Sequence, residues 1–222
     1  MQITRVEATP KSGEGLRDVR GDVVRRRLQA DYGIIFSEVR SIVGFLINSD
    51  VSPESIADRV DDLFADPIIE HSTLNQTFLE SKEIFESTPD AVISVGFKPG
   101  VTDNPGKAAL DGFRTIFPDA SIDSDISTYI TYAFYGVNGQ ATPEFIASKL
   151  YNNLIERAVV SDSEMSQQDN WPMIEYPEKP PQEFKQPAHI DLEIGDNELI
   201  EISETGLLAL NLEEMKTIQS HY

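Results

Sequence analysis

The chain has 222 residues, and its 38 Asp and Glu against 18 Lys and Arg give a formal net charge of −20. Hydrophobic residues make up 40% of the chain, enough to bury a core, which argues against disorder of the whole chain. Cys is absent, which excludes disulfides and thiolate chemistry. No apolar run reaches the roughly 18 residues of a transmembrane helix, and the N-terminal residues lack the apolar core of a signal peptide. We therefore expect a soluble, cytoplasmic chain.

The charge balance also bears on partners and metals. Nucleic-acid binding requires clustered Lys and Arg, and the one basic cluster, residues 25–27, is typical of the solvated face of a helix. The same negative charge opposes binding to anionic membranes. The three His residues lie far apart without helical pairing, at His71, His189 and His221. We expect no nucleic acid, no membrane and no metal site.

An internal repeat is the main signal along the chain. Residues 52–57 read SPESIA and residues 142–147 read TPEFIA, 90 residues further on. In both, a Ser or Thr can cap a helix whose first position is Pro, where the missing N–H costs no hydrogen bond. Apolar residues follow at helical spacing, which predicts a helix with one buried stripe.

The flanking segments extend the repeat on both sides. Strand and helix patterns alternate in the same order in each copy. In the first copy the predicted elements are a strand, a helix, a strand, the Pro-started helix and a short strand, at residues 3–8, 18–30, 39–47, 52–64 and 67–71. In the second copy they fall at residues 92–97, 105–117, 126–137, 142–154 and 158–161.

Each copy thus predicts a β-α-β-α-β unit, or β-α-β-β-α-β if Gly44 and Gly136 break the middle strands. Helices covering an antiparallel sheet are the economical packing, which gives an α+β fold. Two copies predict a pair related by pseudo-two-fold symmetry, the covalent version of a homodimer. We expect the first repeat at residues 1–80, the second at 91–163 and a linker region at 164–222. Residues 73–79 are expected to form an edge strand that joins the copies.

The last sixty residues follow a different pattern. Repeated Pro residues between 164 and 189 predict an extended linker, anchored to the body by Trp171, the only Trp. Residues 190–202 predict a hairpin. Asn211 and Glu214 have the spacing of a capping box and predict a final helix. That helix reaches Tyr222 without a stop signal, so we expect the protein to continue beyond it.

The residues after the predicted strand at 92–97 carry a family resemblance. Residues 92–107, VISVGFKPGVTDNPGK, resemble the opening of the PurS family, the small subunit of phosphoribosylformylglycinamidine synthase. Residues 65–70, ADPIIE, resemble its closing segment. The first copy departs from the family at residues 9–15, and the second departs at residues 157–160. Residues 204–219 resemble the start of the linker helix in the PurL family, the large synthetase chain.

The resemblance implies a place in purine biosynthesis. The whole enzyme would convert formylglycinamide ribonucleotide, glutamine and ATP into the formylglycinamidine ribonucleotide, with ammonia passed from a glutaminase unit. Fusion of two PurS-like copies to the synthetase would replace a dimer by an intramolecular pair. Its partners would be the synthetase domains of the same chain and a glutaminase domain or subunit. ATP and Mg would belong to the parent chain, and this part would hold no cofactor and no catalytic residue.

The loop of the resemblance supplies the candidate site residues. As an interface loop it would present Lys98, Gly100, Asp103, Gly106 and Lys107 to a partner. Alternatively it is a turn that starts a helix, with Asp103 or Asn104 as the capping residue. Glycines and two lysines are present there without the spacing of a phosphate-binding loop.

A second function from another class stays open. The same repeat pattern fits a stand-alone pair of ferredoxin-like regulatory domains that binds a small effector, since fold alone does not determine function. Aromatic side chains crowd the strand at 126–137, where core packing and ligand stacking are both compatible with the pattern: Tyr129, Tyr132, Phe134 and Tyr135.

Overall fold

The computed structural model describes residues 1–13, 15–82, 84–85, 87–138, 141–162, 171, 173–178 and 190–221. The chain forms two compact units, Met1–Pro180 and Pro181–Tyr222. Most of the predicted linker, including Pro172, Pro181 and Pro187, lies outside the described residues.

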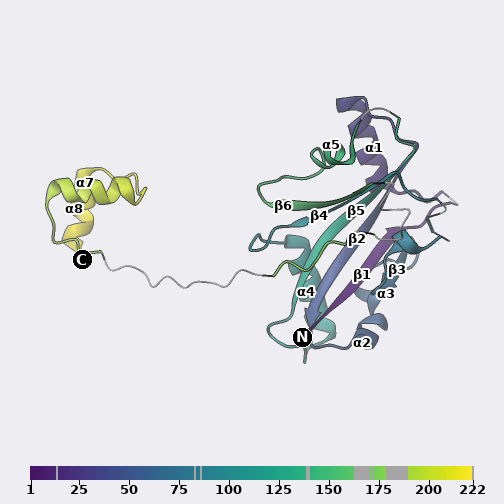
Figure 1. The fold of residues 1–222 in the computed structure, drawn as a ribbon. Coiled ribbons are helices and arrows are strands. Elements are labelled where there is room, and N and C mark those ends of the chain that lie inside the picture. The colour runs from purple at the N-terminus through teal and green to yellow at the C-terminus, as the bar shows by residue number, and fades with distance from the viewer. Residues whose placement is uncertain are drawn as a thin grey trace. The chain divides into compact units, whose positions relative to one another are not determined.

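A single six-stranded antiparallel sheet organises the first unit (Figure 1). Its strand order is β3-β1-β2-β5-β4-β6, and every neighbouring pair is antiparallel. The expected α+β class, with helices over an antiparallel sheet, is confirmed. The strands are β1 (Gln2–Pro10), β2 (Glu38–Ser49), β3 (Glu70–Leu74), β4 (Ala91–Phe97), β5 (Asp125–Tyr135) and β6 (Glu156–Asp162).

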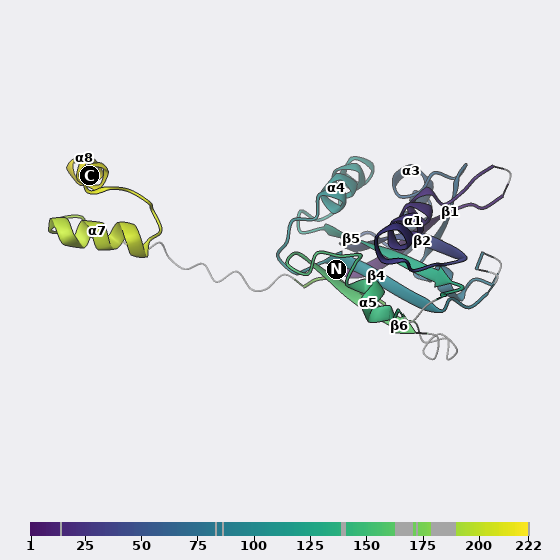
Figure 2. The same cartoon turned by 90° about the horizontal axis from the view of Figure 1, so that it is seen from above.

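The helices of this unit begin where the sequence predicts. Asp18 caps α1 and Asp103 caps α4, while Ser52 and Thr142 cap the two helices that start with Pro. All of them pack on one face of the sheet, and Figure 2 shows α1, α3 and α4 along the same side of the central strands. The helices are α1 (Val19–Tyr32), α2 (Pro53–Ala57), α3 (Val60–Leu63), α4 (Asn104–Ile116) and α5 (Pro143–Ala147).

The Pro-started helices are shorter than expected. The predicted helix at 52–64 is split into α2 and α3, and the one at 142–154 is reduced to α5. In both places the backbone tightens to i→i+3 hydrogen bonds, from Arg59 N–H to Ile56 and from Lys149 N–H to Ile146. The buried stripe survives the break, since Ile56, Val60 and Phe64 are all buried.

The end of the predicted first repeat also differs. Asp66 starts a turn in which its carboxylate accepts the Ile68 N–H and its carbonyl accepts the Ile69 and Glu70 N–H groups. The strand expected at 67–71 is therefore displaced to β3, Glu70–Leu74. Only the first two residues of the edge strand expected at 73–79 lie in a strand, because the edge strand β3 ends at Leu74 and residues 78–80 form the short 3-10 helix η1 (Phe78–Glu80). The strand β3 pairs with β1 and does not join the two halves, so that part of the expectation is wrong.

The helix face contains two hydrophobic cores, and each draws a helix from the other half of the chain. The first contains Val6 of β1 and Ile47 of β2, closed by Leu110 and Phe113 of α4. The second contains Ile93 and Val95 of β4 with Phe134 of β5, closed by Leu28 of α1. Neither half of the chain therefore completes its own core.

The opposite face of the sheet, the irregular face, is covered by loop segments and the short 3-10 helix η1, rather than by α-helices. Phe78, Phe85 and Trp171 pack there on Ile42 of β2, Val92 of β4 and Ala133 of β5. Beside them, Ile174 packs on Leu46 and Tyr129. Trp171 is buried, so its predicted role as an anchor on the body is confirmed.

The second unit holds α7 (Asp196–Thr205) and α8 (Leu212–His221). The hairpin expected at 190–202 is wrong, because Gly195 starts a helix in place of a turn and the Glu198 carboxylate accepts the Gly195 N–H. The capping box is confirmed: Asn211 accepts the Glu214 N–H, and Glu214 accepts the Asn211 N–H.

A substitution at Gly44 tests how tightly the irregular face of the sheet is packed. The expected break at Gly44 does not occur, because β2 runs on through it opposite Tyr129. A Cβ at Gly44 would overlap the Tyr129 ring. Gly44→Ala is therefore expected to lower the free energy of unfolding by about 2 kcal/mol or more, measured by urea unfolding followed through Trp171 fluorescence.

Gly112→Ala is the matched control for Gly44→Ala. Its added Cβ would meet only the flexible Leu63 side chain, at 3.3 Å, within helix α4. Ala also favours a helix interior by about 1 kcal/mol over Gly. Equal destabilisation by the two substitutions would contradict the proposed role of Gly44.

Candidate functional site

The predicted interface loop is the segment that starts α4. Asp103 is its capping residue, with Oδ1 accepting the Gly106 N–H at 2.7 Å and Oδ2 accepting the Thr128 N–H at 2.5 Å. A Cβ at Gly106 would overlap the Ile126 carbonyl, so the helix approaches β5 closely only because this residue is Gly. Gly100 has a positive φ of 84°, which Gly adopts without strain. Three of the five candidate residues thus shape the turn itself.

The two lysines of this loop have different surroundings. The Lys98 ammonium donates to the Asn153 carbonyl, next to the last turn before β6. The Lys107 side chain is exposed on α4. Only Lys107 is therefore free to meet a partner without breaking a hydrogen bond of the loop.

The start of α1 has the same hydrogen bonds as the start of α4. Asp18 accepts the Gly21 N–H at 2.7 Å, and its second oxygen accepts the Ser41 N–H of the neighbouring strand. A Cβ at Gly21 would overlap the Val39 carbonyl, as at Gly106. Lys11 donates to the Pro67 carbonyl at 2.5 Å, in the position that Lys98 occupies in the other half.

The turns before β3 and β6 also match. Asp66 and Glu70 exchange hydrogen bonds in the first turn, and Asn152 and Glu156 make the same bonds in the second. The hydrogen bonds of the 65–70 segment therefore recur around Asn152, ahead of residues 157–160, where the family resemblance predicts a departure.

A groove lies beside the start of α1, with a volume of about 690 Å³. Exposed apolar side chains line it, with Leu16 39% exposed and Val23 54% exposed. Basic side chains stand among them, and no hydrogen bond or ion pair is found for Arg17 or Arg20 within the described part of the chain. We call this surface the α1 groove; it is formed chiefly by Lys11, Leu16, Arg17, Arg20, Val23 and Tyr132.

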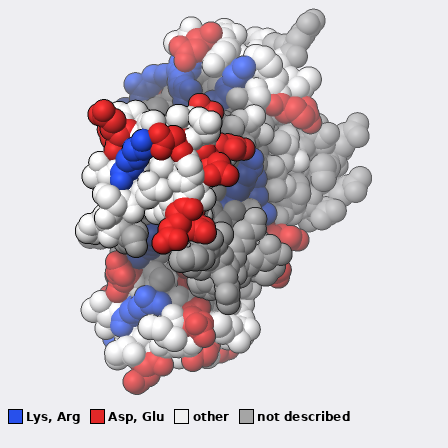
Figure 3. Space-filling view, turned by 90° about the vertical axis from the view of Figure 1, so that its left-hand side faces the viewer, with Lys and Arg blue, Asp and Glu red and all other residues white. Residues whose placement is uncertain are grey.

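Basic residues outnumber acidic ones in the α1 groove, where Asp18 and Glu70 lie beside Lys11, Arg17, Arg20 and Arg27, although the whole chain has a net charge of −20. Carboxylate side chains form several separate groups on the face drawn in Figure 3, with Lys and Arg among them. A groove that joins apolar and cationic side chains is suited to an acidic protein surface.

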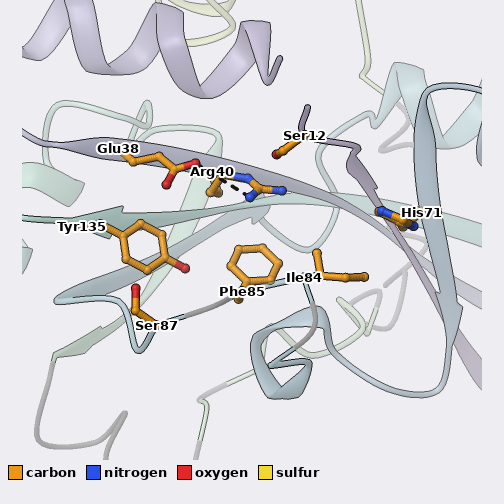
Figure 4. A pocket seen from close by; sticks show the side chains of 8 residues that line it. All are labelled: Ser12, Glu38, Arg40, His71, Ile84, Phe85, Ser87 and Tyr135. Carbon is orange, nitrogen blue, oxygen red and sulfur yellow. Dashed lines mark ion pairs between the residues drawn. The ribbon is translucent and has the colours of Figure 1, made fainter. Parts of the chain in front are cut away.

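A cleft of about 530 Å³ opens on the irregular face of the sheet. Figure 4 shows Arg40 of β2 at its centre, between Glu38 and Phe85. The guanidinium carbon lies 5.1 Å from the centre of the Phe85 ring, and Nη1 lies 3.7 Å from the Glu38 carboxylate. We call this site the Arg40 cleft; its lining is Ser12, Glu38, Arg40, His71, Ile84, Phe85, Ser87 and Tyr135.

Two polar atoms of the Arg40 cleft have no hydrogen-bond partner. Arg40 is only 8% exposed, and its Nη2 donates to the Pro10 carbonyl at 3.2 Å while its Nε has no acceptor. The Tyr135 hydroxyl is also buried without a partner. Burial raises the pKa of Tyr135 above its ordinary value, so the hydroxyl stays a proton donor.

A buried polar network crosses the same face farther along the sheet. The Arg5 guanidinium donates to the Tyr129 hydroxyl at 2.6 Å, and that hydroxyl donates to Glu7 at 2.6 Å. The second oxygen of Glu7 accepts the Phe78 N–H at 3.0 Å. Arg5 also donates to the Ile174 carbonyl at 2.9 Å. The network therefore fastens the segments that carry Phe78 and Ile174 to the sheet.

Sequence reasoning missed both polar groups on this face. Arg40 lies in a predicted strand, where its alternation with Ile42 put it on a buried face, and a buried Arg was the available signal. The sequence is compatible with both core packing and ligand stacking for the aromatic residues of the predicted strand at 126–137. Tyr129 and Phe134 prove to be core residues, whereas the Tyr135 hydroxyl borders the Arg40 cleft.

Comparisons with known proteins do not identify a family. No family model matches the chain, and no curated protein matches its sequence. Within the described residues there is no group of three or more His, Asp or Glu side chains that could hold a metal ion. No described helix is long and apolar enough to cross a membrane.

Glu7 makes the stability of the chain depend on pH. Desolvation by burial raises the pKa of Glu7, and this outweighs the donors around it. As pH rises above about 4.5, unfolded Glu7 loses its proton before folded Glu7 does, so unfolding becomes more favourable. We expect the free energy of unfolding of the unmodified chain to fall with rising pH relative to that of the Glu7→Gln variant. Urea unfolding at a series of pH values from about 4 to about 8 measures this difference.

The test is how the difference in unfolding free energy between the unmodified chain and the Glu7→Gln variant changes with pH, rather than the size of that difference. Glu54→Gln, which changes an exposed carboxylate at the start of α2, serves as the control and should show a much flatter difference. A Glu7→Gln difference that is flat or rises with pH would contradict the raised pKa.

Proposed function

We propose that this chain is the N-terminal docking module of a phosphoribosylformylglycinamidine synthase, formed by two fused PurS-like repeats related by pseudo-two-fold symmetry. Its role is to help assemble the glutaminase and synthetase units and to form part of the route for ammonia. The observation that carries the docking role is the α1 groove, where exposed apolar side chains lie beside Arg17 and Arg20.

The matched hydrogen bonds support the duplication. Two helix starts each combine an Asp cap, a Gly in close contact with a strand carbonyl and a Lys bonded to the turn before an edge strand. Independent origin of this whole combination in both halves is improbable. The closing turns at Asp66 and Asn152 add a further match.

The crossed helices support the fusion of the two copies. Because α1 closes the core of the second half and α4 closes that of the first, the halves are stable only as a pair. A linker that keeps them together holds each at a high effective concentration for the other. We infer a module that is permanently assembled and that presents a preformed surface to its partners.

The chemistry of the described residues is consistent with docking. Glu7, the deeply buried carboxylate, is held by Tyr129 and a backbone N–H, and is engaged in structure. ATP and Mg belong in this proposal to the synthetase domains of the parent enzyme, and the glutaminase is a fused domain or a separate subunit. We expect the isolated chain to have neither ATPase nor glutaminase activity.

The test compares glutamine with ammonia as the nitrogen source in the assembled enzyme. Val23→Glu places a charge on the apolar wall of the α1 groove and should reduce glutamine-dependent synthesis about tenfold, while ammonia-dependent synthesis changes less than about twofold. Ile122→Glu, at an exposed apolar residue outside the groove, should leave both activities unchanged. Measurable ATPase activity of the isolated chain, or no effect of Val23→Glu, would contradict the proposal.

A further inference from the structure

The Arg40 cleft contains a buried hydrogen-bond donor without an acceptor. A buried guanidinium is costly unless its N–H groups find acceptors, and charged groups need more compensation than neutral ones. Arg40 has one carbonyl and one distant carboxylate, and Glu38 is itself 55% exposed, so the ion pair is weak. The Nε–H group has no acceptor among the described residues.

Tyr135, which also lines the cleft, likewise lacks a hydrogen-bond partner. The Tyr135 hydroxyl is a buried donor without an acceptor, and it borders the same hollow. Figure 4 shows the Tyr135 and Arg40 side chains near the Phe85 ring, with Arg40 above it and Tyr135 to its left. Two buried donors without partners at the Arg40 cleft favour a ligand that supplies acceptor oxygens.

We infer that the Arg40 cleft binds a small carboxylate-bearing molecule, with its carboxylate accepting from the Arg40 guanidinium and the Tyr135 hydroxyl. A carboxylate has two acceptor oxygens in the geometry of the guanidinium fork. The volume of about 530 Å³ falls within the range of small-molecule sites.

The rest of the lining fits the body of such a molecule. Ile84 and Phe85 form an apolar wall, while Ser12, Ser87 and His71 offer polar groups around it. The Phe85 ring stacks on the Arg40 guanidinium. The Arg40 Nε and the Tyr135 hydroxyl have almost no exposed surface, so a ligand reaches them only after neighbouring side chains shift. The inference concerns a site separate from the α1 groove and does not depend on the docking role.

The first test measures binding of defined carboxylates to the 222-residue chain. Isothermal titration with acetate, succinate and glutamate is expected to give saturable binding of at least one, with a Kd of about 1 mM or tighter. The methyl esters of the same acids, which lack the charge, should bind at least about tenfold more weakly. Absence of saturable binding for all three acids, or binding of inorganic phosphate alone, would overturn the inference.

Tyr135→Phe separates ligand binding from folding. The variant removes a buried hydroxyl that has no partner, so the free chain should unfold at the same or a higher temperature. The same variant should weaken carboxylate binding at least about threefold, because one donor to the carboxylate is lost. Unchanged affinity in a folded Tyr135→Phe chain would overturn the role of this hydroxyl.

Arg40→Met removes the charge while keeping a long side chain, and should weaken binding at least about tenfold. Arg59→Met is the matched control, since Arg59 forms an exposed ion pair with Asp62 and should leave the affinity within about twofold. Equal affinities of the Arg40→Met and Arg59→Met chains would overturn the inference.

Discussion

The pairing of β2 with β5 is the interaction on which the rest of the first unit depends. It runs from Glu38 opposite Tyr135 to Asn48 opposite Asp125 and joins the two halves of the chain into one sheet. Each half then lays its long helix across this junction, so that α1 and α4 close the core of the opposite half. Separation at this pair would expose a strand edge and open two cores together.

The two faces of the sheet are covered in different ways. The helix face is closed by regular packing, and the irregular face is closed by segments that polar contacts hold in place. Tyr129 lies over Gly44, and its hydroxyl joins Arg5 to Glu7. Arg5 and Glu7 then bond to Ile174 and Phe78 of the covering segments. Farther along this face the cover is incomplete, and there Arg40 and Tyr135 border an open cleft. The candidate ligand site thus exists where this polar closure ends.

The elements whose signals are local could be predicted from the sequence. Strand alternation, the caps at Ser52 and Thr142 and the capping box of Asn211 and Glu214 all appear where expected. The displaced β3 could not be predicted, since the turn at Asp66 depends on hydrogen bonds to Glu70 that no periodicity reveals. The helix at Gly195 was mistaken for a turn because Gly, Asp and Asn favour both. The Arg40 cleft depends on residues from several distant segments, which only the fold brings together.

We propose that the two halves form one cooperative structure through β2, β5 and the crossed helices. The most direct measurement uses two separate fragments, residues 1–86 and 87–180, with urea unfolding followed by far-UV circular dichroism because the first fragment contains no Trp. Each fragment alone should lack a cooperative transition as a monomer, and an equimolar mixture should restore the transition of the intact unit. Either fragment unfolding cooperatively as a monomer, with the midpoint of the intact unit, would contradict the account.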